Sequence, residues 1–347
     1  MTPSPAPSPA RSNSFADLGS LLFLGAVWGG VWLFMRVAAP EVGPVWAAEV
    51  RVALAALILV VVAGRRTWRT ARGRIGDFLF TGATFSAIPF TLIAFATLTL
   101  PVGLGALLNA ATPLFTALVG AFVLGQRLSG RVIAGVAVGM VAVAVVVGWS
   151  PLDLGPGTLA AVGAALGAAL SYAVAGTFVR RRLHGIPGIE VATGQLVSAS
   201  IVLLPFAIAS GAPGVPSAAG VASLVAVAVI STALAWPLYF RVLGRTSATA
   251  ASTVTFIVPA FAIVWGAIAL GESIGPEVVV GFALIMVSLA LVLGLPLPGG
   301  LGRVPARVRQ GRARIMPPST GTIAPVTNDA AGDRRKAPTR PISATSP

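Results

Sequence analysis

Apolar segments of about 20 residues follow one another along most of this 347-residue chain. An α-helix needs about 20 apolar residues to cross the roughly 30 Å hydrocarbon core of a bilayer. Ten such segments are predicted, near residues 18–38, 43–63, 77–98, 102–124, 130–148, 157–179, 189–209, 217–240, 247–270 and 276–295. Strands of a membrane barrel alternate apolar and polar residues, whereas these segments are continuous. We therefore expect an all-α membrane protein with ten transmembrane helices.

The composition excludes an ordinary soluble protein. Only 10% of the residues are charged and 56% are hydrophobic, whereas a soluble domain has about 25% charged residues. The chain has no cysteine and one histidine, His184, which we expect in a solvated loop. Thiolate metal sites, iron–sulfur clusters, disulfides and multi-histidine metal sites are thereby excluded. We expect no metal and no cofactor.

The two ends of the chain differ from its apolar body. Residues 1–17 are rich in Pro and Ser and are predicted to form a disordered leader, and residues 296–347 a disordered basic tail. The tail carries nine basic residues and two aspartates, which account for half of the net charge of +14. A large positive charge is typical of nucleic-acid-binding proteins. Its location here indicates membrane topology and attraction to anionic lipid headgroups instead, so no nucleic-acid partner is expected.

Arginine residues are concentrated in alternate loops. The loops that carry them span residues 64–76, 125–131, 180–188 and 241–246, and the other connections carry acidic residues. Cytoplasmic loops of membrane proteins are enriched in Lys and Arg. With ten helices, both termini then lie in the cytoplasm. We expect a multi-pass protein of the cell membrane, and the sequence leaves its oligomeric state open.

An internal repeat divides the apolar region into two parts. A shift of 146 residues places Pro113–Gln126 on Pro259–Glu272, and a shift of 144 residues aligns the early helices. We interpret residues 18–148 and 157–295 as two five-helix repeats. Because five is odd, the second repeat enters the membrane inverted relative to the first. Inverted repeats are typical of secondary transporters, whose sites lie near the midplane between the repeats.

The chain resembles the EamA-type transporters of the drug/metabolite transporter superfamily over about residues 18–295. The residues that carry the resemblance are Leu24–Gly30, Arg51, Pro113–Leu128 and Pro259–Ser273. The family has Glu after the Leu-Gly pair of both halves, whereas this chain has Gln126 in the first half. The resemblance implies ten helices, cytoplasmic termini and movement of a small metabolite, amino acid or drug-like solute.

Charged and polar residues inside the second helix of each repeat are candidates for function. Charges within a bilayer usually face a cavity or a partner. Arg51 is a candidate for binding a carboxylate, because its planar fork pairs with that group; a structural role on helix carbonyls is the alternative. Glu49 is a candidate for proton coupling, with a pairing to Arg36 or a hydrated surface position as the alternatives. Gln195 takes the place of Arg51 in the second repeat.

The fourth helix of each repeat carries a polar residue one turn before a proline. Asn109 precedes Pro113, and Thr255 precedes Pro259. A proline inside a helix leaves a carbonyl without its partner and kinks the helix. Asn109 and Thr255, which lie beside these kinks, are therefore candidates for lining a central binding site. The alternative is hydrogen bonding between helices. The third helices are likewise interrupted, by Pro89 and Pro237.

Aromatic and small residues complete the set of candidates. Trp32, Tyr172, Trp236 and Tyr239 are predicted to add aromatic surface to the site, although packing or lipid contact is the alternative. Glycines four residues apart, in the pairs 25/29, 135/139 and 163/167, predict close helix packing.

These observations predict a secondary transporter that works by alternating access, as an exporter or exchanger of a small solute. No catalytic motif such as His-Glu-x-x-His or a phosphate-binding loop is present. We therefore do not expect an enzyme. The alternatives are a lipid-modifying enzyme in the membrane, which needs a cluster of acidic residues or histidine, and a non-transporting scaffold, which predicts a closed apolar interior.

Overall fold

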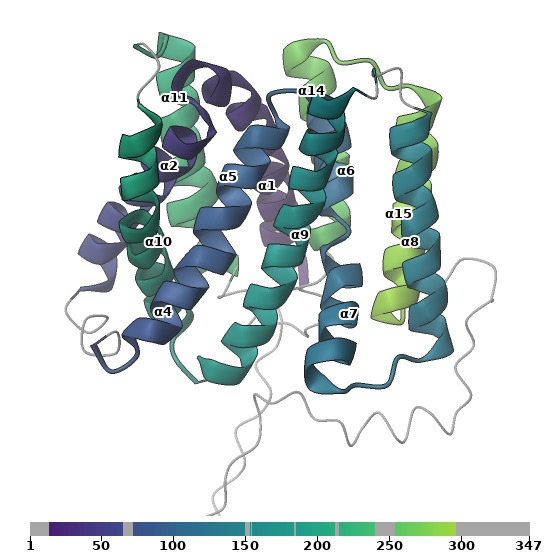
Figure 1. Ribbon diagram of the computed structural model, residues 1–347, viewed down its shortest axis with the longest axis horizontal. Coiled ribbons are helices and arrows are strands. Elements are labelled where there is room, and N and C mark those ends of the chain that lie inside the picture. Colours follow the sequence, from purple (N-terminus) through teal and green to yellow (C-terminus); the bar gives the residue numbers. More distant parts are fainter. Residues whose placement is uncertain are drawn as a thin grey trace, which may run out of the picture. The chain divides into compact units, whose positions relative to one another are not determined.

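The computed structural model describes residues 14–64, 72–149, 153, 155–183, 185–211, 215–239 and 254–295, which are helical apart from short connections. The predicted disordered tail, most of the predicted leader and His184 lie outside the described residues. Helices of the first predicted repeat, shown from purple to blue in Figure 1, are α1 (Ser14–Val42), α2 (Pro44–Ala63), α4 (Ile75–Gly82), η1 (Ala83–Ala87), α5 (Ile88–Ala96), α6 (Val102–Asn109), α7 (Thr112–Leu124) and α8 (Gly130–Gly148). Those of the second are α9 (Pro156–Arg182), α10 (Gly188–Ser210), α11 (Ala218–Ala228), η2 (Val229–Leu234), α14 (Val254–Leu270) and α15 (Pro276–Leu293).

The helix lengths agree with the spans predicted from hydropathy. Within the described ranges, nine helical segments are long and apolar enough to cross a membrane, and the 17 residues of α14 form one shorter apolar helix. The span predicted at 247–270 begins among residues that the structure does not describe. The described part of this membrane protein is therefore all-helical, with nine candidate spans and one shorter apolar helix.

Large apolar side chains cover the outer surface of the helices. Phe122 is 85% exposed, Val61 76% and Ile268 73%. Water would penalise such a surface, whereas hydrocarbon does not, so these side chains fit a lipid environment. Polar residues such as Glu49 and Arg51 are instead buried, each 4% exposed. This distribution is the reverse of that in a soluble protein.

Helices at corresponding places in the two repeats pack in corresponding ways. The second helices, α2 and α10, pack on each other, as do the fifth helices, α8 and α15, which lie side by side in Figure 1. The first helix of each repeat packs on the third and fourth helices of the other, so that α1 contacts α11 and α14 while α9 contacts α5 and α7. Each repeat thus completes the core of the other.

Glycines allow the closest of these helix approaches. A Cβ atom added at Gly29 of α1 would lie 2.9 Å from the Ala262 nitrogen and the Val258 oxygen of α14. One added at Gly139 of α8 would lie 2.8 Å from the Ser288 hydroxyl of α15. Gly25 and Gly135 make similarly close contacts, so two of the predicted glycine pairs are confirmed. The pair at 163/167 is not: a Cβ at Gly163 meets nothing within 4 Å.

Both third helices contain a π-helical turn at the same place in the repeat, since η1 and η2 begin 146 residues apart. In η1 the Ile88 N–H bonds to the Ala83 carbonyl, five residues back. The next residue, Pro89, has no N–H, which leaves the Thr84 carbonyl without its helical partner. The Ser171 hydroxyl of α9 donates to that carbonyl at 2.6 Å. The predicted interruption at Pro89 is therefore a π turn whose freed carbonyl is satisfied from the other repeat.

The second π turn is also hydrogen bonded to the first helix of the other repeat. The Trp28 indole N–H of α1 donates to the Ser231 carbonyl at 3.2 Å, and the Ser231 hydroxyl donates to the Val27 carbonyl at 3.2 Å. Trp28 and Val27 correspond, in the frame shifted by 144 residues, to Tyr172 and Ser171. The two π turns are thus held by equivalent positions of the two first helices.

Candidate functional site

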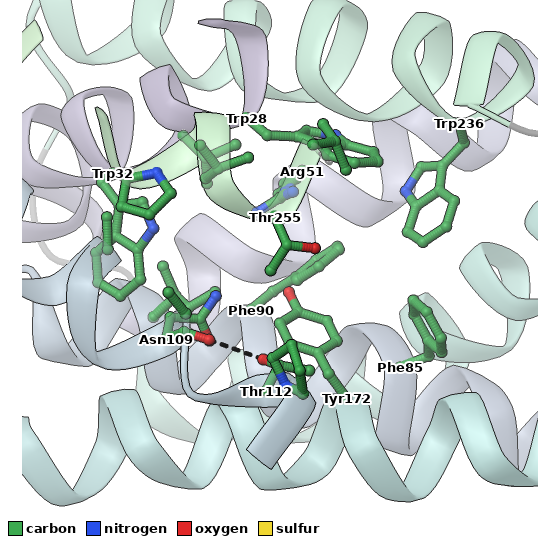
Figure 2. Close-up of a pocket in the computed structure, with 18 residues that line it drawn as sticks. Trp28, Trp32, Arg51, Phe85, Phe90, Asn109, Thr112, Tyr172, Trp236 and Thr255 are labelled. Carbon is green, nitrogen blue, oxygen red and sulfur yellow. Dashed lines mark hydrogen bonds between the residues drawn. The ribbon is translucent and has the colours of Figure 1, made fainter. Parts of the chain in front are cut away.

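A cavity of about 230 Å³ lies where the two predicted repeats meet. Side chains from the first, third and fourth helices of both repeats, together with α2, form its wall (Figure 2). Lining residues of the first repeat are Trp28, Val31, Trp32, Arg51, Phe85, Phe90, Ile93, Ala106, Asn109, Ala110, Thr112 and Pro113. Those of the second are Tyr172, Trp236, Val254, Thr255, Val258 and Pro259.

The fourth helix of the first repeat is broken at the cavity. Its first part, α6, ends at Asn109, and α7 begins at Thr112 after a turn of two residues. Pro113 has no N–H to donate to the Asn109 carbonyl one turn earlier. The Thr112 hydroxyl donates to that carbonyl instead, at 2.8 Å (Figure 2). Such discontinuous helices are tolerated within a membrane only where they are buried or line a cavity.

Arg51 is the one cationic side chain among the described residues that line the cavity. Its Nε donates to the Thr232 hydroxyl of η2 at 3.0 Å, and its guanidinium carbon lies 3.6 Å from the centre of the Phe90 ring. Its Nη1 is buried and has no hydrogen-bond partner within the described ranges. An unpaired buried donor on a cation is costly, so this nitrogen has the capacity to donate to an acceptor such as a carboxylate.

Asn109 supplies an unpaired acceptor on the same cavity. Its Oδ1 is buried and makes no hydrogen bond with any described residue. Figure 2 shows Asn109, Thr255 and the Tyr172 hydroxyl around the interior, with Arg51 behind Thr255. The cavity therefore combines a cationic donor with neutral polar groups that can accept a hydrogen bond.

Aromatic rings form one side of the cavity. The Phe85 ring lies 5.6 Å from Tyr172 and 5.2 Å from Trp236, both edge to face, and Trp28 lies 5.9 Å from Trp236. Offset and edge-to-face pairs at these separations are the favourable arrangements of aromatic rings. The rings come from both repeats, so they provide a large apolar surface that the two repeats share.

Most residues predicted for the site lie together. The cavity wall includes the predicted residues Arg51, Asn109, Thr255, Trp32, Tyr172 and Trp236 and the prolines Pro113 and Pro259. The shifts of 144 and 146 residues align the two repeats in sequence, but they do not show which aligned residues meet in space. The crossed packing of the first and fourth helices is what brings Asn109 and Thr255 to one place.

Five predicted residues are not among the described residues that line the cavity. Pro89 and Pro237 follow the π turns and are chain neighbours of the wall residues Phe90 and Trp236, but they do not line the cavity themselves. The ring of Tyr239 lies 5.3 Å from that of Trp28, another wall residue. Gln195 is 2% exposed in α10, where that helix contacts α2. The shift of 144 residues pairs it with Arg51 in sequence, but its side chain is packed outside the cavity.

Glu49 also lies outside the cavity wall. It is buried at the contact of α2 with α10, where its Oε1 accepts a hydrogen bond from the Ser200 hydroxyl at 2.5 Å. Its Oε2 has no hydrogen-bond partner among the described residues. Among the described residues no salt bridge joins Glu49 to Arg36, whose Nη1 donates to the Thr97 carbonyl at 2.5 Å.

Sequence reasoning missed several residues of the site. Phe85, Phe90 and Thr112 line the cavity, and Thr232 holds Arg51. Two phenylalanines in an apolar segment carry no signal that separates them from packing residues. One sequence feature could have indicated Thr232, because a hydroxyl inside a membrane helix needs a hydrogen-bond partner. Thr232 lies in the third helix of the second repeat, and its partner Arg51 lies in the second helix of the first.

An all-helical membrane protein whose two internal repeats enclose a largely apolar cavity with a few polar side chains has the architecture of a transporter. The model of the EamA-like transporter family matches residues 18–148 and 159–294. These two matches cover most of the chain, so the protein belongs to the EamA-like transporter family, as the resemblance implied, and carries two EamA halves. It is a membrane transporter and not an enzyme.

Curated relatives match most of the chain at low identity. A protein of Salmonella typhimurium named a probable amino-acid metabolite efflux pump is 27% identical over 286 residues, covering 77% of this chain and 91% of the relative. A probable terminal-alkyne amino-acid exporter of Streptantibioticus cattleyicolor is 26% identical, covering 79% and 92%. A solved crystal structure aligns with a TM-score of 0.57 at 17% identity over 81% of this chain and 96% of its own. This structural match concerns the fold alone.

Proposed function

We propose that this transporter moves a small, carboxylate-bearing metabolite of the amino-acid class out of the cell by alternating access. The observation that carries the proposal is the buried Nη1 of Arg51, which has no partner in the described part of the chain and belongs to a side chain on the cavity wall. A planar guanidinium is suited to a carboxylate. The proposed ligand supplies the acceptor that the described protein residues do not.

The other walls define the rest of the ligand. Asn109 Oδ1, which also lacks a partner in the described ranges, is an acceptor suited to an ammonium group. The rings of Trp28, Phe85 and Trp236 are suited to an apolar side chain. A carboxylate, an ammonium group and an apolar side chain together are the features of an apolar α-amino acid.

The size of the cavity favours a metabolite over a drug-like compound. Pockets for drug-sized ligands begin at about 300 Å³, and this cavity is smaller, at about 230 Å³. The names of the Salmonella and Streptantibioticus relatives refer to amino-acid efflux and export. These names support an amino-acid-class solute and outward transport for this chain. An exchanger, which moves a second solute inward in return, would use the same alternating-access mechanism.

The topology that we propose has ten spans in two inverted five-helix repeats. The described loops support it: the end of α9 carries Arg180, Arg181 and Arg182, whereas Asp153 and Glu272 lie in connections at the opposite ends of the spans. In this arrangement α14 is the tenth span and both termini are cytoplasmic. The repeats keep their predicted limits, 18–148 and 157–295, with a leader at 1–17 and a basic tail at 296–347 that attracts anionic lipids of the cell membrane.

Glu49 is the residue that we propose for proton coupling. Glu49 is 4% exposed, and its Oε2 has no partner among the described residues. An ionised carboxylate at such a place is costly, and binding a proton removes that cost. Replacement by Gln keeps the hydrogen bond from Ser200 but removes the titratable group. In proteoliposomes, E49Q is expected to transport equally with and without a proton gradient; an unchanged gradient dependence would exclude this role.

The sequence leaves a non-transporting scaffold as an alternative function, and membership of the family does not by itself exclude it. It predicts that Arg51, Asn109 and Thr255 lie away from any cavity, whereas all three line the same one. This arrangement favours transport over a purely structural role.

A thermal-shift screen of the purified protein tests the proposal. We expect apolar amino acids to raise the melting temperature, and their carboxamides, which lack the carboxylate, to raise it less. The same shifts should be absent in R51Q. Equal shifts with acids and amides, or equal shifts in R51Q and the wild type, would contradict carboxylate binding at Arg51.

A further inference from the structure

Thr232 connects the second predicted repeat to the binding cation of the first. It lies in the π turn η2 and is fully buried, at 0% exposure. Its hydroxyl oxygen accepts the Nε–H of Arg51 at 3.0 Å. Arg51 belongs to α2, 181 residues earlier in the chain, so this hydrogen bond crosses from one repeat to the other. Thr232 itself is not among the described residues of the cavity wall.

The π turn determines the direction of this hydrogen bond. The Thr232 hydroxyl donates to the Val227 carbonyl, five residues back, at 2.8 Å. A hydroxyl has a single hydrogen to donate, and the hydrogen of Thr232 is used in this bond. Only its oxygen lone pairs remain for Arg51. The hydroxyl is therefore fixed as an acceptor and cannot rotate without losing its own bond.

Two contacts set the plane of the Arg51 guanidinium. Thr232 binds the Nε edge, and the Phe90 ring lies against the flat face, 3.6 Å from the guanidinium carbon. A planar group held at one edge and on one face has little freedom to rotate. The terminal nitrogens, including the unpaired Nη1, are thereby held in place for a ligand.

The same positions of the other repeat lack this arrangement. Ser86 of η1 corresponds to Thr232 in the frame of 146 residues, and Gln195 corresponds to Arg51 in the frame of 144. The Ser86 hydroxyl and the Gln195 Nε2 are both buried without a hydrogen-bond partner among the described residues. The hydrogen bond between Arg51 and Thr232 therefore has no counterpart between Gln195 and Ser86. Ser86 is a matched control for Thr232, because it is the equivalent hydroxyl without the arginine.

We infer that Thr232 is a positioning residue that sets the preference of the cavity for a carboxylate over the corresponding amide, by holding the guanidinium of Arg51 through Nε. The inference rests on the proposed function, in which Arg51 binds the carboxylate. Thr232 contributes specificity without contacting the solute. Loss of its oxygen leaves Nε without an acceptor and frees the guanidinium to turn toward other groups.

The test measures the dissociation constants of acid and amide probes by isothermal titration calorimetry on the purified full-length protein. The probes are L-alanine, L-leucine and L-phenylalanine, each with its carboxamide. The variants are T232V, which has nearly the same shape without the hydroxyl, T232S, which keeps the hydroxyl, S86A as the matched control and R51Q. The melting temperature of each variant reports whether it is folded.

We expect the wild type to bind the best amino acid at least tenfold more tightly than its amide. T232V should weaken binding of the acid about tenfold, the effect expected for a hydrogen bond to a charged group, while amide binding changes by less than about twofold. T232S and S86A should both keep the wild-type preference. If T232V is not folded, T232C, with a weak sulfur acceptor, should shift the preference in the same direction.

The outcomes separate this inference from the function on which it rests. A wild-type protein that binds none of the probes, or binds acids and amides equally, contradicts the proposed function. A preference that R51Q abolishes and T232V retains leaves the proposed function in place and overturns the role of Thr232. A T232V variant that weakens acid and amide binding equally also overturns it, because a general structural loss does not discriminate between the probes.

Discussion

Arg51 has the most unusual surroundings of any residue in the cavity. It is 4% exposed inside a predicted membrane span and forms no salt bridge with a described residue. Charges in such places are expensive and mark functional sites. Thr232 and Phe90 compensate part of the cost, at one edge and one face of the guanidinium. The remaining unpaired donor is the reason to assign a ligand to it.

Replacing Arg51 by Gln is expected to separate stability from binding. Because Nη1 is buried and unpaired, removal of the charge should leave the melting temperature in detergent unchanged or raise it, while affinity for acid ligands falls by about 30-fold or more. Arg36 provides the control: it donates to the Thr97 carbonyl, so R36Q should lower the melting temperature. A large loss of stability in R51Q would instead indicate a structural arginine.

At the scale of single residues, the sequence pointed to both polar and aromatic residues of the cavity wall, and it missed residues of both kinds. Arg51, Asn109 and Thr255 stand out because a polar group in an apolar span needs a reason to be there. Phe85 and Phe90 do not stand out, since phenylalanine is as suitable for packing as for a cavity. Gln195 is a predicted site residue only because it aligns with Arg51 in sequence. Such an alignment does not indicate whether a side chain points toward the cavity or away from it.

The third helices are the elements in which local structure and the contact between repeats are most closely connected. Pro89 leaves the Thr84 carbonyl free, and Ser171 of α9 donates to it at 2.6 Å. We expect S171A to lower the free energy of unfolding by about 0.6–1 kcal/mol, a typical value for such bonds in membranes, as measured by chemical denaturation. In a P89A background, which restores an N–H for that carbonyl, the cost of S171A should disappear. Equal costs in both backgrounds would contradict this account.

The approach of α1 to α14 depends on a glycine. A Cβ at Gly29 lies 2.9 Å from backbone atoms of α14 that cannot turn away, so G29A is expected to destabilise the protein by about 1–3 kcal/mol. The matched change is G163A, where a Cβ meets nothing within 4 Å. There the better helix propensity of Ala should leave stability equal or higher. Similar melting temperatures for both variants would show that α1 and α14 do not pack closely at Gly29.

At the scale of elements, spans were predicted well and their internal irregularities were not. A span is set by the thickness of hydrocarbon, which leaves a clear pattern of about 20 apolar residues. Prolines indicate that Pro89 and Pro113 disturb their helices. They do not indicate whether the result is a π turn, as at η1, or a break of two residues, as between α6 and α7. That outcome depends on partners such as Ser171 and Thr112.

The absence of cysteine allows a direct test of the topology of the whole molecule, because single cysteines can be introduced without further changes. With inverted repeats, D153C should react with a membrane-impermeant maleimide in intact cells. R181C, at the arginine-rich end of α9, should react only after the membrane is made permeable. Labelling of both from the same side would contradict the proposed orientation of α9.

The proposed alternation between two states relies on parts that the two halves share. The first helix of each repeat packs on the third and fourth helices of the other, and the Arg51–Thr232 bond joins α2 to η2 where the two elements pack together. In the proposed function, a solute at Arg51 contacts wall residues that come from both repeats. The repeat was visible in the sequence, but this crossed packing was not, since it depends on contacts between residues far apart in the chain, such as Thr84 with Ser171 and Trp28 with Ser231.

The central claim is that the Arg51 cavity binds a small amino-acid-class carboxylate and carries it across the membrane. The most direct measurement is counterflow of radiolabelled L-alanine, L-leucine and L-phenylalanine into proteoliposomes loaded with the same unlabelled amino acid, for the wild type and for R51Q. We predict uptake of at least one of the three by the wild type, and uptake by R51Q at the level of empty liposomes. No uptake of any of them by the folded wild type, or equal uptake by R51Q, would contradict the account.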